Sequence, residues 1–392
     1  MEDTPMLAFV GALKRASKEL QINPIFTTTH RYQPSMDTFL ELDTQAQALL
    51  PSNPKRSNLF KQFCELKSLL RKLRKLQGHS LSTLLQRYIT SYKIYQIAFL
   101  IEAETQAYID NEFMQKLVET LQHVSYEEEK VIILKEVEKR LLRGFDRDFQ
   151  ELVLKAKLFY ILESLVCDST RSKSIREHGA TVIVALVRFN RDVFVGLVLM
   201  GPIVQALLSM DSCCSIKVLS SLVRLIRIPL IDQIELDGQI PRIISLLSEE
   251  DLPIKVATME CICEIAYHGR KEVIEAILEQ GLIKKLVELQ RSIHGDNLID
   301  IHECNGSENI VDIDGGLQWD TDFNMKGQKT VENPPFASCV AKFSVQVEVG
   351  EGLSQKERTN LKLEIMRRIK ECNVSEAEFA TITAEVLWGS SP

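Results

Sequence analysis

Four glycines that each separate two apolar segments constrain the fold of this chain more than any other feature. They are Gly179, Gly201, Gly238 and Gly281. Gly201 and Gly238 lie 37 residues apart, and Gly238 and Gly281 lie 43 residues apart. Apolar segments that recur at this distance predict repeated structural units of roughly 40 residues. The 22 residues between Gly179 and Gly201 are too few for one unit, which indicates that one helix is lost or merged there.

A second pair of matching segments supports this period. The strings Ile216-Lys217-Val218 and Ile254-Lys255-Val256 begin 38 residues apart. We expect each glycine to end a helix, where the chain turns left-handed at little steric cost to glycine. Helical units of about 40 residues are typical of armadillo and HEAT arrays, in which each unit buries its apolar face against the next. The predicted fold is all-α, an N-terminal helical bundle followed by an armadillo/HEAT-like α-solenoid.

The chain divides into five parts by composition. Prolines interrupt the first part, and eight acidic residues without lysine or arginine mark residues 292–325. An apolar pattern returns at Phe336, where the spacing fits a helix and the alternation from Phe343 to Val349 also fits a strand. Because the segments around it are helical, we expect a helix. The predicted parts are an irregular leader at 1–58, a helical bundle at 59–144, armadillo-like repeats at 149–291, an acidic insertion loop at 292–334 and a C-terminal helical unit at 335–392 that closes the solenoid.

The segment from residue 80 to residue 124 contains neither proline nor glycine. Its apolar residues recur at steps that predict one face of a helix, namely Leu84, Leu85, Tyr88, Tyr92, Tyr95 and Phe99. A helix with one apolar stripe normally packs that stripe against other helices. We therefore expect this face to lie inside the bundle, with a third bundle helix from Tyr126 to Leu142.

The repeat segment resembles the armadillo family in particular strings. The stretch from Gly238 to Leu247, followed by Ile254–Ala257 and Glu264–Ala266, resembles the armadillo consensus. From about Gly144 onward the chain is similar to plant armadillo-repeat superfamily proteins of unassigned biochemistry. The bundle before it resembles, more weakly, the N-terminal domains of plant proteins that combine a U-box with armadillo repeats. No U-box is evident, so the resemblance implies a repeat scaffold and not ubiquitin-ligase activity.

One departure from the family excludes a class of partner, the extended basic peptides. Armadillo arrays that bind extended basic peptides, such as importin-alpha proteins, carry tryptophans and asparagines on their third helices. Here Glu260 stands where the tryptophan would be, and Glu264 where the asparagine would be. Both tryptophans of the chain, Trp319 and Trp388, lie outside those helices. A receptor for nuclear-localisation signals is therefore not expected.

Charged pairs within the repeats are the candidate partner-binding residues. Arg224 and Arg227 are three residues apart, and Glu260 and Glu264 are four apart, so each pair lies on one helix face. Charged stripes on stacked helices would form a surface for a protein segment. The alternative is that these side chains are solvated or form internal salt bridges.

A basic segment at residues 55–75 is the candidate for binding an anionic membrane surface. It holds eight lysines and arginines and a single acid, Glu65. The residues predicted to bind such a surface are Lys67, Arg71, Lys72, Arg74 and Lys75. Each basic residue near anionic lipid contributes about 1 kcal/mol. The alternative is that the leucines of this helix pack into the bundle while its basic side chains face water or the acidic insertion.

No pattern in the sequence predicts catalysis. A Gly-x-Ser-x-Gly elbow, a phosphate-binding loop, a dinucleotide fingerprint and a paired zinc-histidine helix are all absent. Cys261 and Cys263 would point about 200° apart on a helix and so could not share a metal ion. His302 and Cys304 lack a second ligand pair, and the acidic string at Asp312 lacks the glycine and glutamate of a calcium loop. We expect no catalytic residue, cofactor, metal ion or small-molecule substrate.

Charge and cysteine content indicate which partners and which cellular compartment to expect. A net charge of −7 over 392 residues does not indicate a specific nucleic-acid partner. The nine cysteines lie mostly in apolar helical segments and are expected to be reduced, and no secretory signal is visible, which favours the cytoplasm or the nucleus. The leading hypothesis is a non-catalytic protein–protein interaction scaffold or adaptor. The alternatives are a peripheral membrane adaptor that docks through residues 55–75 and a non-catalytic subunit of a ubiquitin-ligase assembly.

Overall fold

The computed structural model describes residues 4–22, 33–50, 57–76, 80–123, 126–295, 335–372 and 374–388, and every regular element among them is a helix. The described residues divide into two compact units. Unit 1 comprises residues 1–119 and 146–156, and unit 2 comprises residues 120–145 and 157–392. The all-α class predicted from the sequence is confirmed.

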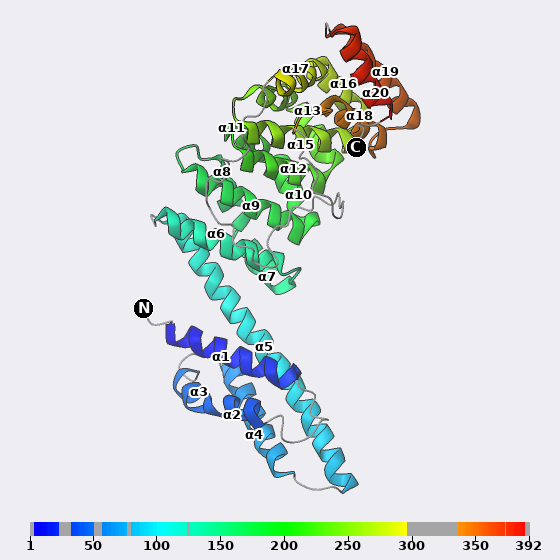
Figure 1. Ribbon diagram of the computed structural model, residues 1–392. Helices are drawn as coiled ribbons and strands as arrows, with labels where there is room; N and C mark the ends of the chain where they lie inside the picture. The colour runs from blue at the N-terminus through cyan, green and yellow to red at the C-terminus, as the bar shows by residue number, and fades with distance from the viewer. Residues whose placement is uncertain are drawn as a thin grey trace. The chain divides into compact units, whose positions relative to one another are not determined.

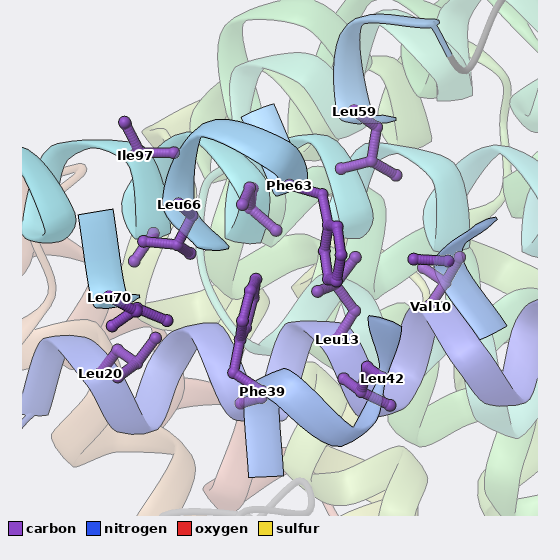
Figure 2. Packing of buried hydrophobic residues seen from close by; sticks show 14 of the residues in the cluster. Val10, Leu13, Leu20, Phe39, Leu42, Leu59, Phe63, Leu66, Leu70 and Ile97 are labelled. Carbon is purple, nitrogen blue, oxygen red and sulfur yellow. The ribbon is translucent and has the colours of Figure 1, made fainter. Parts of the chain in front are cut away.

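Unit 1 is a bundle of helices around one apolar core. Its helices are α1 (Thr4–Ile22), α2 (Gln33–Glu41), α3 (Asp43–Leu49), α4 (Ser57–Lys75), most of α5 (Leu81–Gln122) and α7 (Arg147–Lys155). Figure 2 shows side chains from α1, α2, α4 and α5 packed together. The rings of Phe39 and Phe63 stack with centroids 4.8 Å apart at the centre of this cluster. Polar links tie α5 to its neighbours, because Gln21 Nε2 donates to Glu102 Oε2 at 2.7 Å and Gln62 Nε2 donates to Glu104 Oε1 at 3.1 Å.

The predicted leader at 1–58 differs from the structure, which places three helices there. In α1 the buried residues lie on one face at helical spacing, and they are Met6, Phe9, Val10, Leu13, Ala16, Ser17 and Leu20. This spacing is the signature of an amphipathic helix whose apolar face enters the core. The prolines that suggested an irregular segment fall between helices or in the first turn of α2. The bundle therefore begins at α1 rather than at residue 59.

Unit 2 is a solenoid of three-helix repeats. Its helices are α6 (Glu127–Leu142), α8 (Leu158–Cys167), α9 (Lys173–Phe189), α10 (Arg191–Met200), α11 (Ile203–Ser209), α12 (Cys213–Ile226), α13 (Ile228–Leu236), α14 (Ile240–Ser245), α15 (Leu252–His268), α16 (Lys271–Glu279), α17 (Leu282–Gly295), α18 (Cys339–Val349), α19 (Gln355–Glu371) and α20 (Glu376–Trp388). Successive repeats are α10–α12, α13–α15 and α16–α18, the second completed by the 3₁₀ turn Leu246–Ser248. The third helices pack in series, α9 on α12, α12 on α15 and α15 on α18 (Figure 1). This in-line packing confirms the predicted α-solenoid.

The glycines that revealed the period play two different roles. Gly238 and Gly281 have φ angles of 64° and 76°, so the predicted left-handed turn is confirmed at these two positions. The prediction is wrong for Gly201, where φ is −95°, and for Gly179, which lies within α9. A Cβ at Gly179 would stand 3.3 Å from Val166 Cγ2, so glycine is used there for close packing of α8 on α9. Because Gly179 ends no helix, its short distance to Gly201 marks no missing helix.

Two predicted boundaries move once packing is considered. α6 packs against α9, so the third helix of the predicted bundle at 59–144 belongs to unit 2. α17 continues to Gly295, and the remainder of the predicted insertion, residues 296–334, lies outside the described residues.

The segment after the insertion is helical and completes a repeat. α18 adopts a helix rather than the alternative strand. It packs on both α15 and α17, which makes it the third helix of the repeat that begins with α16. The insertion therefore falls inside a repeat, and α19 and α20 alone follow the last complete one. Ser375 Oγ accepts a hydrogen bond from the backbone N–H of Glu378 at 3.2 Å and so caps the N-terminus of α20.

Candidate protein-interaction surface

The stacked third helices leave one stripe of side chains exposed or half-exposed. Most of the other side chains on α9, α12, α15 and α18 are buried, and the members of the stripe recur at helical spacing. We call this stripe the third-helix surface. Its members are Glu177, Thr181 and Arg188 on α9, Lys217 and Arg224 on α12, Glu260, Cys263, Glu264 and Tyr267 on α15, and Lys342, Val345 and Gln346 on α18.

Arg224 and Glu264 form an ion pair across this surface. Arg224 Nε and Nη2 lie 3.1 Å and 2.5 Å from Glu264 Oε1, which joins α12 to α15. Half of the Arg224 side chain is exposed, so solvent screens the pair and its contribution to stability is small. For these two residues the alternative reading of an internal salt bridge describes the structure, although both still face the third-helix surface.

Arg227 pairs with a residue far along the chain instead of extending the stripe on α12. It caps α12 with φ 65°, and its Nη1 donates to Glu351 Oε2 at 3.1 Å. The same carboxylate oxygen lies 3.6 Å from His268 Nδ1. Burial lowers the pKa of His268, while the carboxylates of Glu264 and Glu351 oppose that shift. Arg227 therefore serves an internal cluster at one end of the surface.

Glu260 is the predicted residue that remains available to a partner. Its side chain is exposed, and it takes part in none of the ion pairs found in the described ranges. Lys217 of α12 and Glu260 of α15 act with opposite sign on the pKa of the Cys213 thiol, which burial raises. The two charges thus lie around the same part of the surface, one on each neighbouring helix.

Sequence reasoning missed Arg188, Lys217 and Lys342 as surface residues. Each is exposed on a third helix, and Lys342 follows the segment that separates α18 from the rest of its repeat. The signal that could have found Lys217 is its place as a charged residue between apolar neighbours, Ile216 before it and Val218 after it, both of which are buried. Arg188 stands alone after six consecutive buried residues, so no pattern in α9 marks it.

A tight backbone junction holds the end of the surface together. The backbone N–H of Glu351 donates to the carbonyl oxygen of Tyr267 at 2.8 Å. A Cβ at Gly352 would lie under 3.0 Å from the carbonyl oxygen of Gly269, and a Cβ at Gly350 would meet the carbonyl of Tyr267 in the same way. The two glycines therefore let the chain after α18 approach the C-terminus of α15.

The basic helix α4 keeps only part of its predicted charge free of ion pairs. Lys67 pairs with Asp43, whose carboxyl pKa is lowered by the hydrogen bond from Lys67, and Arg74 lies 3.7 Å from Asp37. A shallow groove on α4 is lined by the exposed or half-buried residues Cys64, Lys67, Ser68, Arg71, Lys72 and Lys75. Among the predicted anion-binding residues, Arg71, Lys72 and Lys75 line this groove without an ion pair in the described part of unit 1.

Neither a metal-ligand cluster nor a single membrane-spanning helix occurs among the described residues. They contain no group of three histidine, cysteine, aspartate or glutamate residues that could hold a metal ion. Burial raises the pKa of Cys261 and Cys263 to about 12, and His302 and Cys304 lie outside the described ranges. Within those ranges no single helix is long and apolar enough to cross a bilayer, whereas α10 and α11, bent by 66°, meet the length and composition requirement only as a pair.

Comparisons with known proteins found similarity to designed repeat structures. No protein-family model and no curated protein matches the chain. A designed armadillo repeat protein is 14% identical, with 70% of this chain and 98% of that chain covered and a TM-score of 0.43. A computationally designed armadillo repeat protein for modular peptide recognition is 16% identical, with 70% and 99% covered and a TM-score of 0.41. Because these sequence identities and TM-scores are low, the assignment of the fold rests on the helix packing of the chain itself.

Proposed function

We propose that this protein is a non-catalytic interaction scaffold that binds a segment of another protein along the third-helix surface. The observation that carries the proposal is the serial packing of α9, α12, α15 and α18, which brings exposed charged side chains from four helices onto one array. Adjacent packed helices lie about 8–10 Å apart, so the four helices span about 30 Å. An extended segment rises about 3.3 Å per residue, so about nine residues would cross the surface.

The charges describe the kind of segment that fits. Arg224 and Glu264 neutralise one another, while Lys217, Glu260 and Lys342 are exposed on three successive helices. These three residues present a positive, a negative and a positive charge in turn. Such a surface favours a segment whose charges have the opposite signs at the matching positions, and it disfavours a uniformly basic segment. The partner we expect carries an acidic, a basic and an acidic residue in that order along the array.

A pair of charge reversals tests the proposal. Glu260→Lys with Lys342→Glu inverts two charges of the surface and leaves the net charge unchanged. The control, Glu279→Lys with Lys284→Glu, makes the same exchange at exposed positions of α16 and α17. Proximity labelling in cells, followed by a binding titration with purified partner, should show at least a tenfold loss for the first variant and none for the control. Equal binding by all three proteins would contradict the proposal.

The groove on α4 supports a second candidate, docking on an anionic membrane. Arg71, Lys72 and Lys75 line one groove and together would contribute about 3 kcal/mol near anionic lipid. Sedimentation with phosphatidylserine vesicles should lose its salt sensitivity in the variant Arg71→Glu, Lys72→Glu and Lys75→Glu. The control reverses three exposed lysines of unit 2, Lys135, Lys284 and Lys370. Absence of salt-sensitive sedimentation in the wild type would eliminate this candidate.

We also propose a reducing compartment, the cytoplasm or the nucleus, as the setting of this scaffold. The support is that all eight cysteines of the described ranges are free thiols, among them the exposed Cys64. Fluorescence microscopy of the tagged full chain tests this proposal. Localisation to a secretory compartment would contradict it.

A further inference from the structure

An apolar stripe on α5 lies on the outside of unit 1. Its members follow one another at steps of four, three, four, three and four residues, and they are Leu81, Leu85, Tyr88, Tyr92, Tyr95 and Phe99. Their exposed fractions range from 49% at Tyr95 to 87% at Leu81. We call this set the α5 stripe. Five of its six members belong to the helix face that the sequence predicted to lie inside the bundle, and that prediction is wrong.

The opposite face of α5 supplies the core contacts of unit 1. Ile94, Ala98 and Ile101 are fully buried in the cluster that also contains side chains of α1 and α4, and Thr105 is buried one turn further along. At 100° per residue these positions lie on the far side of the helix from the α5 stripe. The helix is therefore apolar on two sides, and the side that carries the α5 stripe is exposed.

The spacing of the α5 stripe is that of a helix-pairing seam. Alternating steps of four and three place side chains every 3.5 residues, which is the pattern that packs two helices by knobs into holes. Between Leu81 and Ile101 the only charged residues are Arg87 and Lys93, and helical geometry places both about 120° away from the centre of the stripe. A partner helix with the same uncharged seam meets no unpaired charge.

We propose that the α5 stripe pairs with the α5 stripe of a second copy of this chain, in the antiparallel direction. Large side chains bury about 150–250 Å² each, so six that are roughly half to fully exposed offer about 700 Å² per copy. Two copies then bury about 1,400 Å², which lies within the range of stable specific interfaces. The antiparallel direction sets Leu81 against Phe99, Leu85 against Tyr95 and Tyr88 against Tyr92, so that each of the two leucines meets an aromatic ring.

Sedimentation of the full chain tests the proposed dimer. Between about 1 and 50 µM we expect the wild type to reach twice the 44.6 kDa of one chain. Tyr88→Glu with Tyr92→Glu places four carboxylates at the centre of the seam and should weaken pairing by about 100-fold or more. The control, Tyr160→Glu with Leu363→Glu, alters exposed residues of α8 and α19 and should pair like the wild type.

Other occupants of the stripe give different results, each of which overturns the proposal. A wild type that stays monomeric at 50 µM, about the top of that range, shows that no second copy binds. If the double glutamate variant then has a larger hydrodynamic radius than the monomeric wild type, the substitutions have released unit 2 of the same chain from the stripe. If the monomer instead sediments with phosphatidylcholine vesicles and the double glutamate variant does not, a lipid surface covers it.

Cysteine cross-linking tests the direction. In a Cys64→Ser background, a mixture of Leu81→Cys and Phe99→Cys chains should form disulfide dimers faster than either chain alone, because a disulfide needs Cβ atoms about 4 Å apart. Circular dichroism confirms that each variant keeps its helices. Faster cross-linking of each single variant with itself would overturn the antiparallel pairing.

Discussion

The guanidinium of Arg227 at the end of α12 contacts the carboxylate of Glu351 at 3.1 Å, although 124 residues separate them in the sequence. Glu351 also donates its backbone N–H to Tyr267 at the end of α15. These contacts anchor the chain after α18 to the two preceding third helices. The insertion before α18 is therefore compatible with a continuous solenoid, because the helix that follows it returns to its place in the series.

We expect Gly352→Ala to destabilise the protein. The added methyl would meet the backbone carbonyl of Gly269, which cannot move aside as a side chain can, so the loss should be about 2 kcal/mol. Urea denaturation of the full chain measures it. The control is Gly196→Ala, which meets nothing within 4 Å inside α10 and should stabilise by about 0.5–1 kcal/mol. The same sign for both variants would contradict the close approach at Gly352.

A second pair of variants tests the left-handed turns. Gly281→Ala should cost about 1 kcal/mol because its φ of 76° is unfavourable for an L-residue, although the space around it is open. Gly281→Asn should cost less, since asparagine tolerates this conformation better. Thermal unfolding compares the two variants directly. If alanine were as stable as glycine at this position, the turn could not be left-handed.

The ion pair between Arg224 and Glu264 should contribute little to stability. The pair is partly exposed, so a double-mutant cycle with Arg224→Ala and Glu264→Ala should give a coupling of about 0.5 kcal/mol that fades in 1 M salt. Denaturant unfolding at low and high salt measures this coupling. A coupling above about 2 kcal/mol would assign these residues to structural stabilisation rather than to the third-helix surface.

Stability should fall as the pH drops below about 6.5 because of His268. Burial holds the folded-state pKa of His268 below the ordinary histidine value of about 6.5, so the unfolded chain takes up a proton before the folded chain does. The lost stability begins near the unfolded pKa and is complete below the folded one. His268→Gln should flatten the decline between pH 7.5 and 5.5, about one unit on either side of the unfolded value, in denaturant titrations. An equally steep decline in His268→Gln and in the wild type would contradict this prediction.

Thiol reactivity should separate the cysteines sharply. Burial raises the pKa of Cys261 and Cys339 to about 12, so both are protonated and shielded at pH 8, about four units lower. Cys64 is exposed on α4 and should react with iodoacetamide first. Mass spectrometry of peptides from timed reactions gives the order of labelling. Early labelling of Cys261 in the folded protein would show that α15 is not packed as described.

The sequence predicts the repeats well because their determinants are local. A helix exposes its apolar period through neighbours three and four residues apart, and Gly238 and Gly281 end helices through their own backbone freedom. Glycine alone could not reveal its role at Gly179, since close packing on Val166 is a contact between two helices.

Tertiary structure alone decided which apolar face is buried and which charges are free. The stripe from Tyr88 to Phe99 reads like a core face, yet α1 and α4 pack on the opposite side of α5, because the buried set around Ile94 is equally apolar. Arg224, Arg227 and Glu264 read like a binding stripe, yet each meets a partner 40 or more residues away. By itself the sequence determined the helices and their repeat, which depend on neighbouring residues. Whether a side chain enters the core, forms an ion pair or remains available to a partner depends on contacts between distant segments. Only the folded chain brings those segments together.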